Sequence, residues 1–189
     1  MRPHFTLFQS HIDLAHSYWK RQLIPDDTAV DATCGNGHDS KILASLVSTL
    51  YLFDIQNQAI QATKEALKDS KAELHFYEMC HSKMKDVIPQ GTVKLIVYNL
   101  GYLPGSDKTI KTSPQTTLES VQSSLELVTP GGMISITCYP GHSEGAQEEK
   151  ELVDFARSLC PKSWCVSFEQ ILNRNQAPSL LIFQKAKLF

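Results

Sequence analysis

Hydrophobic and polar positions follow two different periods along this chain, and each period predicts one kind of element. Apolar residues three and four positions apart are typical of an amphipathic helix, whereas short apolar runs bounded by turn residues are typical of a buried strand. Helices are therefore expected at 8–23, 37–47, 57–69, 114–128 and 144–159. Strands are expected at 28–31, 49–54, 72–77, 93–99, 133–138, 164–171 and 179–185.

Strands and helices alternate over the whole length, which predicts an α/β fold with a doubly wound, mostly parallel seven-stranded sheet. The last two strands follow each other without a helix, so they can pair only as a hairpin and one of them must run antiparallel. We expect one domain over residues 1–189, with the helix at 8–23 packed on it. Ligands of such sheets bind at the carboxyl ends of the strands, here 31–40, 54–57, 78–82, 99–112 and 138–145.

Polar residues mark where several helices begin. Asn57 is predicted to cap its helix, and Ser113 is predicted to cap the next one, with Pro114 in the first turn. The last helix has two interpretations. Either Ser143 caps it and His142 is incidental, or His142 is part of a functional site.

Composition excludes several classes of protein. Lys and Arg total 18 against 20 Asp and Glu, so the net charge of −2 rules out a protein that coats nucleic acid by bulk charge. The five cysteines form no zinc pattern, and no metal is expected. No signal peptide is recognised, and no apolar run approaches the roughly 20 residues of a membrane span. We expect a soluble cytoplasmic protein without a membrane partner, and a homodimer is one option for its assembly.

The strongest local signal is a glycine-containing turn between the first predicted strand and the following helix. Gly35 and Gly37 let the backbone pass close to a ligand, and the helix N-terminus offers free N–H donors to an anionic group. Asp54 ends the next strand, 23 positions after Asp31, where a carboxylate can accept both hydroxyls of a ribose. A nucleoside-bearing cofactor is therefore implied. The dinucleotide pattern G-x-G-x-x-G fails at its last place, where Ser40 stands, which disfavours a nicotinamide-dependent oxidoreductase.

The spacing Asp31-x-Thr33-x-Gly35-x-Gly37 resembles the first motif of the Rossmann-like, S-adenosylmethionine-dependent methyltransferases. Amino-group methyltransferases carry Asn/Asp-Pro-Pro-aromatic after the fourth strand, where this chain has Asn-Leu-Gly-Tyr at 99–102 without either proline. Matching blocks at 31–39, 53–56, 99–108 and 141–145, of which the loop block 99–108 is the specific one, extend the likeness to a small family labelled "putative rRNA methylase". That family is associated with converting 5-aminomethyl-(2-thio)uridine at the tRNA wobble position into the methylaminomethyl form.

The resemblance implies S-adenosylmethionine as cofactor. Asp54 and Gln56 would hold its nucleoside, and His81 would edge the adenine or else face solvent. Asn36 and Asp39 would hold the methionine ammonium or carboxylate, or would only cap the helix. The expected cofactor-binding residues are Asp31, Thr33, Gly35, Asn36, Gly37, Asp39, Asp54, Gln56, Cys80, His81, Asn99 and Leu100.

The resemblance also implies how a substrate amine in tRNA is methylated. The Asn99 amide oxygen and the Leu100 carbonyl would aim the amine lone pair at the sulfonium methyl, and Tyr102 would stack on the substrate. A primary amine is mostly protonated at neutral pH, so the site must desolvate it or provide a base, for which His142 is the candidate. The expected catalytic residues are Asn99, Tyr102 and His142, and the expected substrate- or RNA-binding residues are Lys108, Lys111, Glu144, Asn173 and Arg174.

Other functions stay open on the sequence alone. One is a methyltransferase that acts on ribosomal RNA or on a small amine. Another is a cofactor-binding RNA module without turnover, which binding without methyl transfer to any RNA would favour.

Overall fold

The computed structural model describes residues 7–101 and 112–187 of the chain. A seven-stranded sheet forms its centre, with the strands in the order β3-β2-β1-β4-β5-β7-β6. The strands are β1 (Thr28–Asp31), β2 (Thr49–Asp54), β3 (Glu73–Glu78), β4 (Val93–Asn99), β5 (Val128–Cys138), β6 (Trp164–Glu169) and β7 (Ser179–Lys185). The helices are α1 (His11–Gln22), α2 (His38–Ala44), α3 (Asn57–Ala66), α4 (Pro114–Leu127) and α5 (Ser143–Ser158), with a 3₁₀ helix η1 at His81–Asp86.

The predicted doubly wound, mostly parallel sheet is confirmed. Strands β1 to β5 pair in parallel, and β7 is antiparallel to both of its neighbours. The antiparallel strand lies inside the sheet, because β7 inserts between β5 and its hairpin partner β6. The strand order reverses between β1 and β4, which is the position where open α/β sheets form their ligand crevice.

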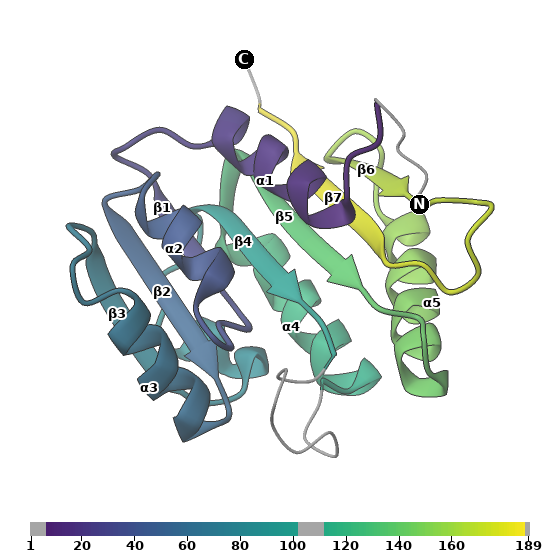
Figure 1. The fold of residues 1–189 in the computed structure, drawn as a ribbon. Coiled ribbons are helices and arrows are strands. Elements are labelled where there is room, and N and C mark those ends of the chain that lie inside the picture. Colours follow the sequence, from purple (N-terminus) through teal and green to yellow (C-terminus); the bar gives the residue numbers. More distant parts are fainter. Residues whose placement is uncertain (1–6, 102–111, 188–189) are drawn as a thin grey trace.

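Helices cover both faces of the sheet, as Figure 1 shows: α1, α2 and α3 lie on one face and α4 and α5 on the other. Successive strand residues therefore enter different apolar layers. In β4, Leu95 packs with Trp19 of α1, whereas Ile96 packs with Val121 of α4. This two-sided burial explains why the central strands are continuous apolar runs instead of alternating ones. None of the helices in the described ranges is both long and apolar enough to cross a membrane.

The structure corrects several local predictions. Ser113 does cap α4, but Asn57 is the first residue of α3 and its Nδ2 donates to Glu78 Oε2 at 2.6 Å. The N-cap of α5 is His142, not Ser143. Residues 129–132, which separate the predicted helix at 114–128 from the predicted strand at 133–138, lie within β5, where the pairing register with β4 shifts. The contact of Asn57 with Glu78 on β3 and the register of β5 against β4 depend on other elements, which the local pattern does not contain.

Candidate active site

A cavity of about 610 Å³ opens at the carboxyl ends of β1, β2, β4 and β5. Its size lies in the usual range for a site that holds a small molecule or cofactor. Most of the residues expected from the sequence line it, namely Thr33, Gly35, Asn36, Asp39, Asp54, Gln56, Cys80, His81, Asn99, Leu100 and His142. Other lining residues were not singled out from the sequence. Four of them lie in the predicted strand-end segments, namely His38, Thr112, Tyr139 and Gly141, whereas Thr116 and Gln176 lie outside those segments.

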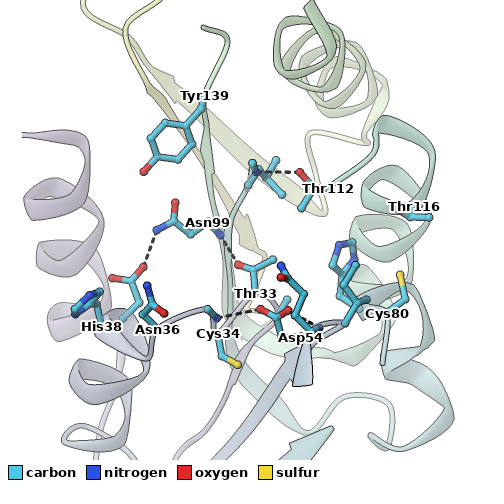
Figure 2. A pocket seen from close by; sticks show the side chains of 18 of the residues that line it. Thr33, Cys34, Asn36, His38, Asp54, Cys80, Asn99, Thr112, Thr116 and Tyr139 are labelled. Atoms are coloured by element: carbon cyan, nitrogen blue, oxygen red, sulfur yellow. Dashed lines mark hydrogen bonds between the residues drawn. The ribbon is translucent and has the colours of Figure 1, made fainter. Parts of the chain in front are cut away.

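The Asp54 carboxylate links the turn after β1 to the turn after β2 by hydrogen bonds (Figure 2). Its Oδ2 accepts the Gly35 N–H at 3.1 Å and its Oδ1 accepts the Gln56 N–H at 2.9 Å. Burial raises the pKa of Asp54, and these backbone hydrogen bonds oppose the rise by favouring the ionised form. Each carboxylate oxygen has a second lone pair, so the group can also accept hydroxyl donors from a sugar.

Asp31 and Gly37 shape the first turn from outside the cavity lining. Asp31 is buried, and its carboxylate accepts the Ser40 hydroxyl at 2.6 Å and the Thr33 N–H at 3.2 Å. Burial, reinforced by the charge of Asp39, raises the pKa of Asp31 to about 7. Gly37 has a φ of +78°, and a Cβ there would lie 3.0 Å from the Cβ of Ala66 on α3. These two residues hold the turn, and Ser40 is the partner that keeps Asp31 in place.

The Asn99 side chain has a fixed orientation at the end of β4. Its backbone N–H donates to Thr33 Oγ1 at 2.8 Å, and its Nδ2 donates to Asp39 Oδ2 at 3.0 Å. The other Asp39 oxygen pairs with His16 Nε2 of α1 at 2.8 Å. Because a carboxylate can only accept, Asp39 must face the Asn99 amide nitrogen. The Asn99 amide oxygen is therefore left facing the cavity, on the side of Tyr139 (Figure 2).

Tyr139 follows β5 and lines the cavity opposite Asn99. Its hydroxyl lies 3.2 Å from His11 Nε2, and the two rings meet edge to face at 5.5 Å between centroids. Burial and the nearby charge of Asp39 raise the pKa of Tyr139 to about 12, while hydrogen bonding with Asn99 lowers it. Helix α1 thus supplies two histidines to the site, one to Tyr139 and one to Asp39.

His142 borders the cavity as the N-cap of α5. Its Nδ1 accepts the Gly145 N–H at 3.0 Å. In a neutral imidazole one nitrogen accepts and the other carries the proton, so this hydrogen bond places the proton on Nε2. A ring held this way has no free acceptor with which to take a proton from a substrate, and the base role expected for His142 is not favoured by this geometry.

His81 is buried at the start of η1 and lines the cavity. Burial lowers its pKa to about 4, so the ring is neutral at physiological pH. Its Nδ1 finds no hydrogen-bond partner within the described ranges of the chain. The ring meets Tyr98 edge to face at 5.7 Å. The neutral ring borders the cavity, where it can pack against a heterocyclic ligand such as adenine.

The two residues that flank the segment 102–111 are hydrogen-bonded to each other. Gly101 and Thr112 are held together because the Gly101 N–H donates to Thr112 Oγ1 and the Thr112 N–H donates to the Gly101 carbonyl, each at 2.9 Å. The Thr112 hydroxyl donates to the buried Glu148 carboxylate at 3.0 Å, and Thr117 donates to the same group at 2.6 Å. The predicted site residues Tyr102, Lys108 and Lys111 fall outside the described residues.

The remaining expected RNA-binding residues do not line the cavity. Glu144 lies in the first turn of α5, and the Arg174 guanidinium sits 4.8 Å from the centre of the Phe8 ring. The loop that carries Asn173 and Arg174 instead reaches the cavity through Gln176. Gln176 has a φ of +54°, a strained conformation for a residue with a side chain.

Comparison with known proteins gives a consistent set of relatives. The family model described as "Putative rRNA methylase" matches residues 50–185. The chain is 36% identical to the tRNA (mnm(5)s(2)U34)-methyltransferase, chloroplastic, of Arabidopsis thaliana, over 92% of this chain and 68% of that protein. It superposes on a putative rRNA methylase from Clostridium thermocellum with a TM-score of 0.90, at 34% identity over 94% of this chain and 98% of the other. It also superposes on a putative methyltransferase from Streptococcus mutans, solved in complex with SAH, with a TM-score of 0.87, at 30% identity over 95% of this chain and 99% of the other.

Proposed function

This chain belongs to the family described as "Putative rRNA methylase", and we propose that it methylates the aminomethyl group of 5-aminomethyl-(2-thio)uridine at the tRNA wobble position. Its membership and its structural relatives make it an S-adenosylmethionine-dependent RNA methyltransferase. The identity of the methylated nucleotide and of its reacting nitrogen is what we propose. Two observations support this proposal: the tRNA methyltransferase relative and the orientation of Asn99.

The polar groups that line the cavity suit S-adenosylmethionine. Asp54 would hold the ribose, since both of its oxygens keep a free lone pair, and the His81 ring, which lines the cavity, would border the adenine. Gly35 and Asn36 line the turn next to Asp54 and would pass beneath the rest of the cofactor. When bound, the cofactor supplies an electrophilic methyl group on a positively charged sulfur.

The observation that carries the proposal is the aimed amide oxygen of Asn99. Asp39 holds the amide nitrogen, so the oxygen faces the cavity, where beside its hydrogen bonding with Tyr139 it has a second lone pair to accept an N–H from a substrate. An amide oxygen orients an amine without placing a full negative charge next to it, and such a charge would favour the unreactive ammonium form. Orientation of this kind can lower a reaction barrier by about 7–11 kcal/mol. A nucleophilic nitrogen is therefore the group that this site fits.

The proposal is tested with tRNA that carries 5-aminomethyl-2-thiouridine at the wobble position. Purified protein and S-adenosylmethionine are incubated with this tRNA, with the same tRNA carrying unmodified uridine, with ribosomal RNA and with a small primary amine. Nucleoside mass spectrometry should detect the methylaminomethyl form from the first substrate and no methylation of the others. Cells that lack the gene should accumulate the unmethylated aminomethyl nucleoside in their tRNA.

The other outcomes distinguish the alternatives. Methylation of ribosomal RNA or of the small amine in place of the tRNA would contradict the proposed wobble substrate. The protein would still be a methyltransferase. Cofactor binding without transfer to any RNA would favour a binding module. A cytoplasmic location, a single domain and assembly as a homodimer stay predictions, and light scattering of the purified protein tests the last of these.

A further inference from the structure

Three polar side chains link the interior of the cavity to the surface helix α1. Asn99 faces the Tyr139 hydroxyl across the cavity (Figure 2), and that hydroxyl lies 3.2 Å from His11 Nε2. His11 is the first residue of α1 and is partly exposed to solvent. The path therefore begins where the substrate nitrogen is expected and ends at water.

Amine methylation requires such a path because the substrate enters mostly as an ammonium ion, which has no lone pair. Three other candidate acceptors at the cavity are already engaged in hydrogen bonds or weakly basic. His142 accepts the Gly145 N–H, and both Asp39 oxygens accept, from His16 and from Asn99. Burial lowers the pKa of His81 to about 4.

We propose, on the basis of the proposed amine methylation, that Tyr139 is a catalytic residue that takes the ammonium proton and passes its own proton to His11. An N–H bond of the ammonium breaks and an O–H bond forms at Tyr139. The original O–H bond of Tyr139 breaks and an N–H bond forms at His11 Nε2, so His11 becomes a cation and the amine becomes neutral. The freed lone pair on the amine is the pair that forms the new bond to carbon. His11 then releases its proton to solvent.

The surroundings of both groups are consistent with this relay. Burial raises the pKa of Tyr139 to about 12, so its hydroxyl keeps a proton to pass on instead of standing as phenolate. Burial lowers the pKa of His11, so Nε2 is neutral and able to accept. Asp13 on α1 and Asp39 on α2 oppose that lowering and stabilise the cation once it forms, while Cys138 of β5 is the further titratable group that faces Tyr139.

The test compares Tyr139→Phe and His11→Gln with the full-length wild-type protein. Phenylalanine keeps the ring and removes the hydroxyl, and glutamine can accept a hydrogen bond but does not titrate. His75→Gln is the matched control, because the His75 ring also packs against a tyrosine, Tyr51, but lies on β3 outside the cavity lining. Single-turnover rates are measured with saturating S-adenosylmethionine and aminomethyl-bearing tRNA from pH 6 to 10.

Both site variants should lose about 10²-fold or more in rate at pH 7, which is the lower end of the ~10²–10⁴-fold contribution of general base catalysis. Their cofactor affinity should stay unchanged, and their rates should approach that of the wild type near pH 10, where free amine is abundant. Added imidazole should restore part of the rate of His11→Ala. The control should match the wild type throughout.

Two results would overturn the relay. One is an unchanged rate at pH 7 in either site variant, and the other is a loss that stays constant from pH 6 to 10, which would assign the residues to positioning alone. If the wild type itself fails to methylate the tRNA, the proposed function fails instead, so the two failures are distinguishable.

Discussion

Replacing Asn99 with alanine tests the central contact of the proposed site. The backbone at this position is held by Thr33 Oγ1 and by the β4 ladder, neither of which involves the side chain. Asn99→Ala should therefore leave β4 and the cofactor-binding turn intact. Asp39 loses one donor but keeps His16, and water can replace the missing N–H because the carboxylate is 18% exposed. We expect the fold to lose about 1 kcal/mol of unfolding free energy.

The effect on turnover should be larger. The amide oxygen that orients the amine disappears, and removal of one positioning group typically lowers a rate by about 10²-fold, or roughly 2.7 kcal/mol of barrier. Asn99→Asp should also be slow. It places a carboxylate oxygen about where Nδ2 now stands, 3.0 Å from Asp39 Oδ2. Repulsion of about 5 kcal/mol at an effective dielectric of ~20 exceeds any hydrogen bond at this place, and the added charge favours the ammonium form.

The assay is single-turnover methylation of tRNA bearing the aminomethyl group, with cofactor affinity measured by calorimetry on the same samples. Asn99→Asp should recover partly as the pH rises and the amine loses its proton. Gln90→Ala is the matched control, because Gln90 also donates from an amide to a carboxylate, Glu126, at the opposite edge of the sheet. A near wild-type rate in Asn99→Ala would remove this residue from the mechanism and refute the reasoning.

Three further predictions concern the cofactor, stability and RNA. Asp54→Ala should weaken S-adenosylmethionine binding by about 1–3 kcal/mol, and calorimetry showing equal binding would contradict the ribose role. Burial raises the pKa of Asp31 from 3.8 to about 7, so the folded state keeps a proton that the unfolded state releases. The unfolding free energy should therefore fall as the pH rises through this interval, and urea titrations of Asp31→Asn should show a flatter dependence. Charge reversal at Lys108 or Lys111 should raise the KM for tRNA and spare cofactor affinity, whereas reversal of Lys162, which follows α5 at the far edge of the sheet, should change neither.

The parts of the site that the sequence predicted are those carried by strand ends. Gly35, Asp54 and Asn99 each follow or end an apolar run, and parallel strands bring their carboxyl ends to one edge of the sheet. Topology alone therefore places them around one cavity. The seven-stranded sheet with its antiparallel hairpin strand follows from the order of elements in the same way.

Only the tertiary structure decided which side chains complete the site. His11 meets Tyr139 across 128 positions and His16 meets Asp39 across 23, and nothing in the periodicity of α1 distinguishes these histidines from solvated ones. The placement of β7 inside the sheet is likewise set by its pairing with β5, which lies about 40 positions or more away in the sequence. The periodicity of apolar residues predicts which face of an element is buried, because residues one period apart lie on the same face of that element. A hydrogen bond between two elements depends on how they pack, and this chain specifies that only once it has folded.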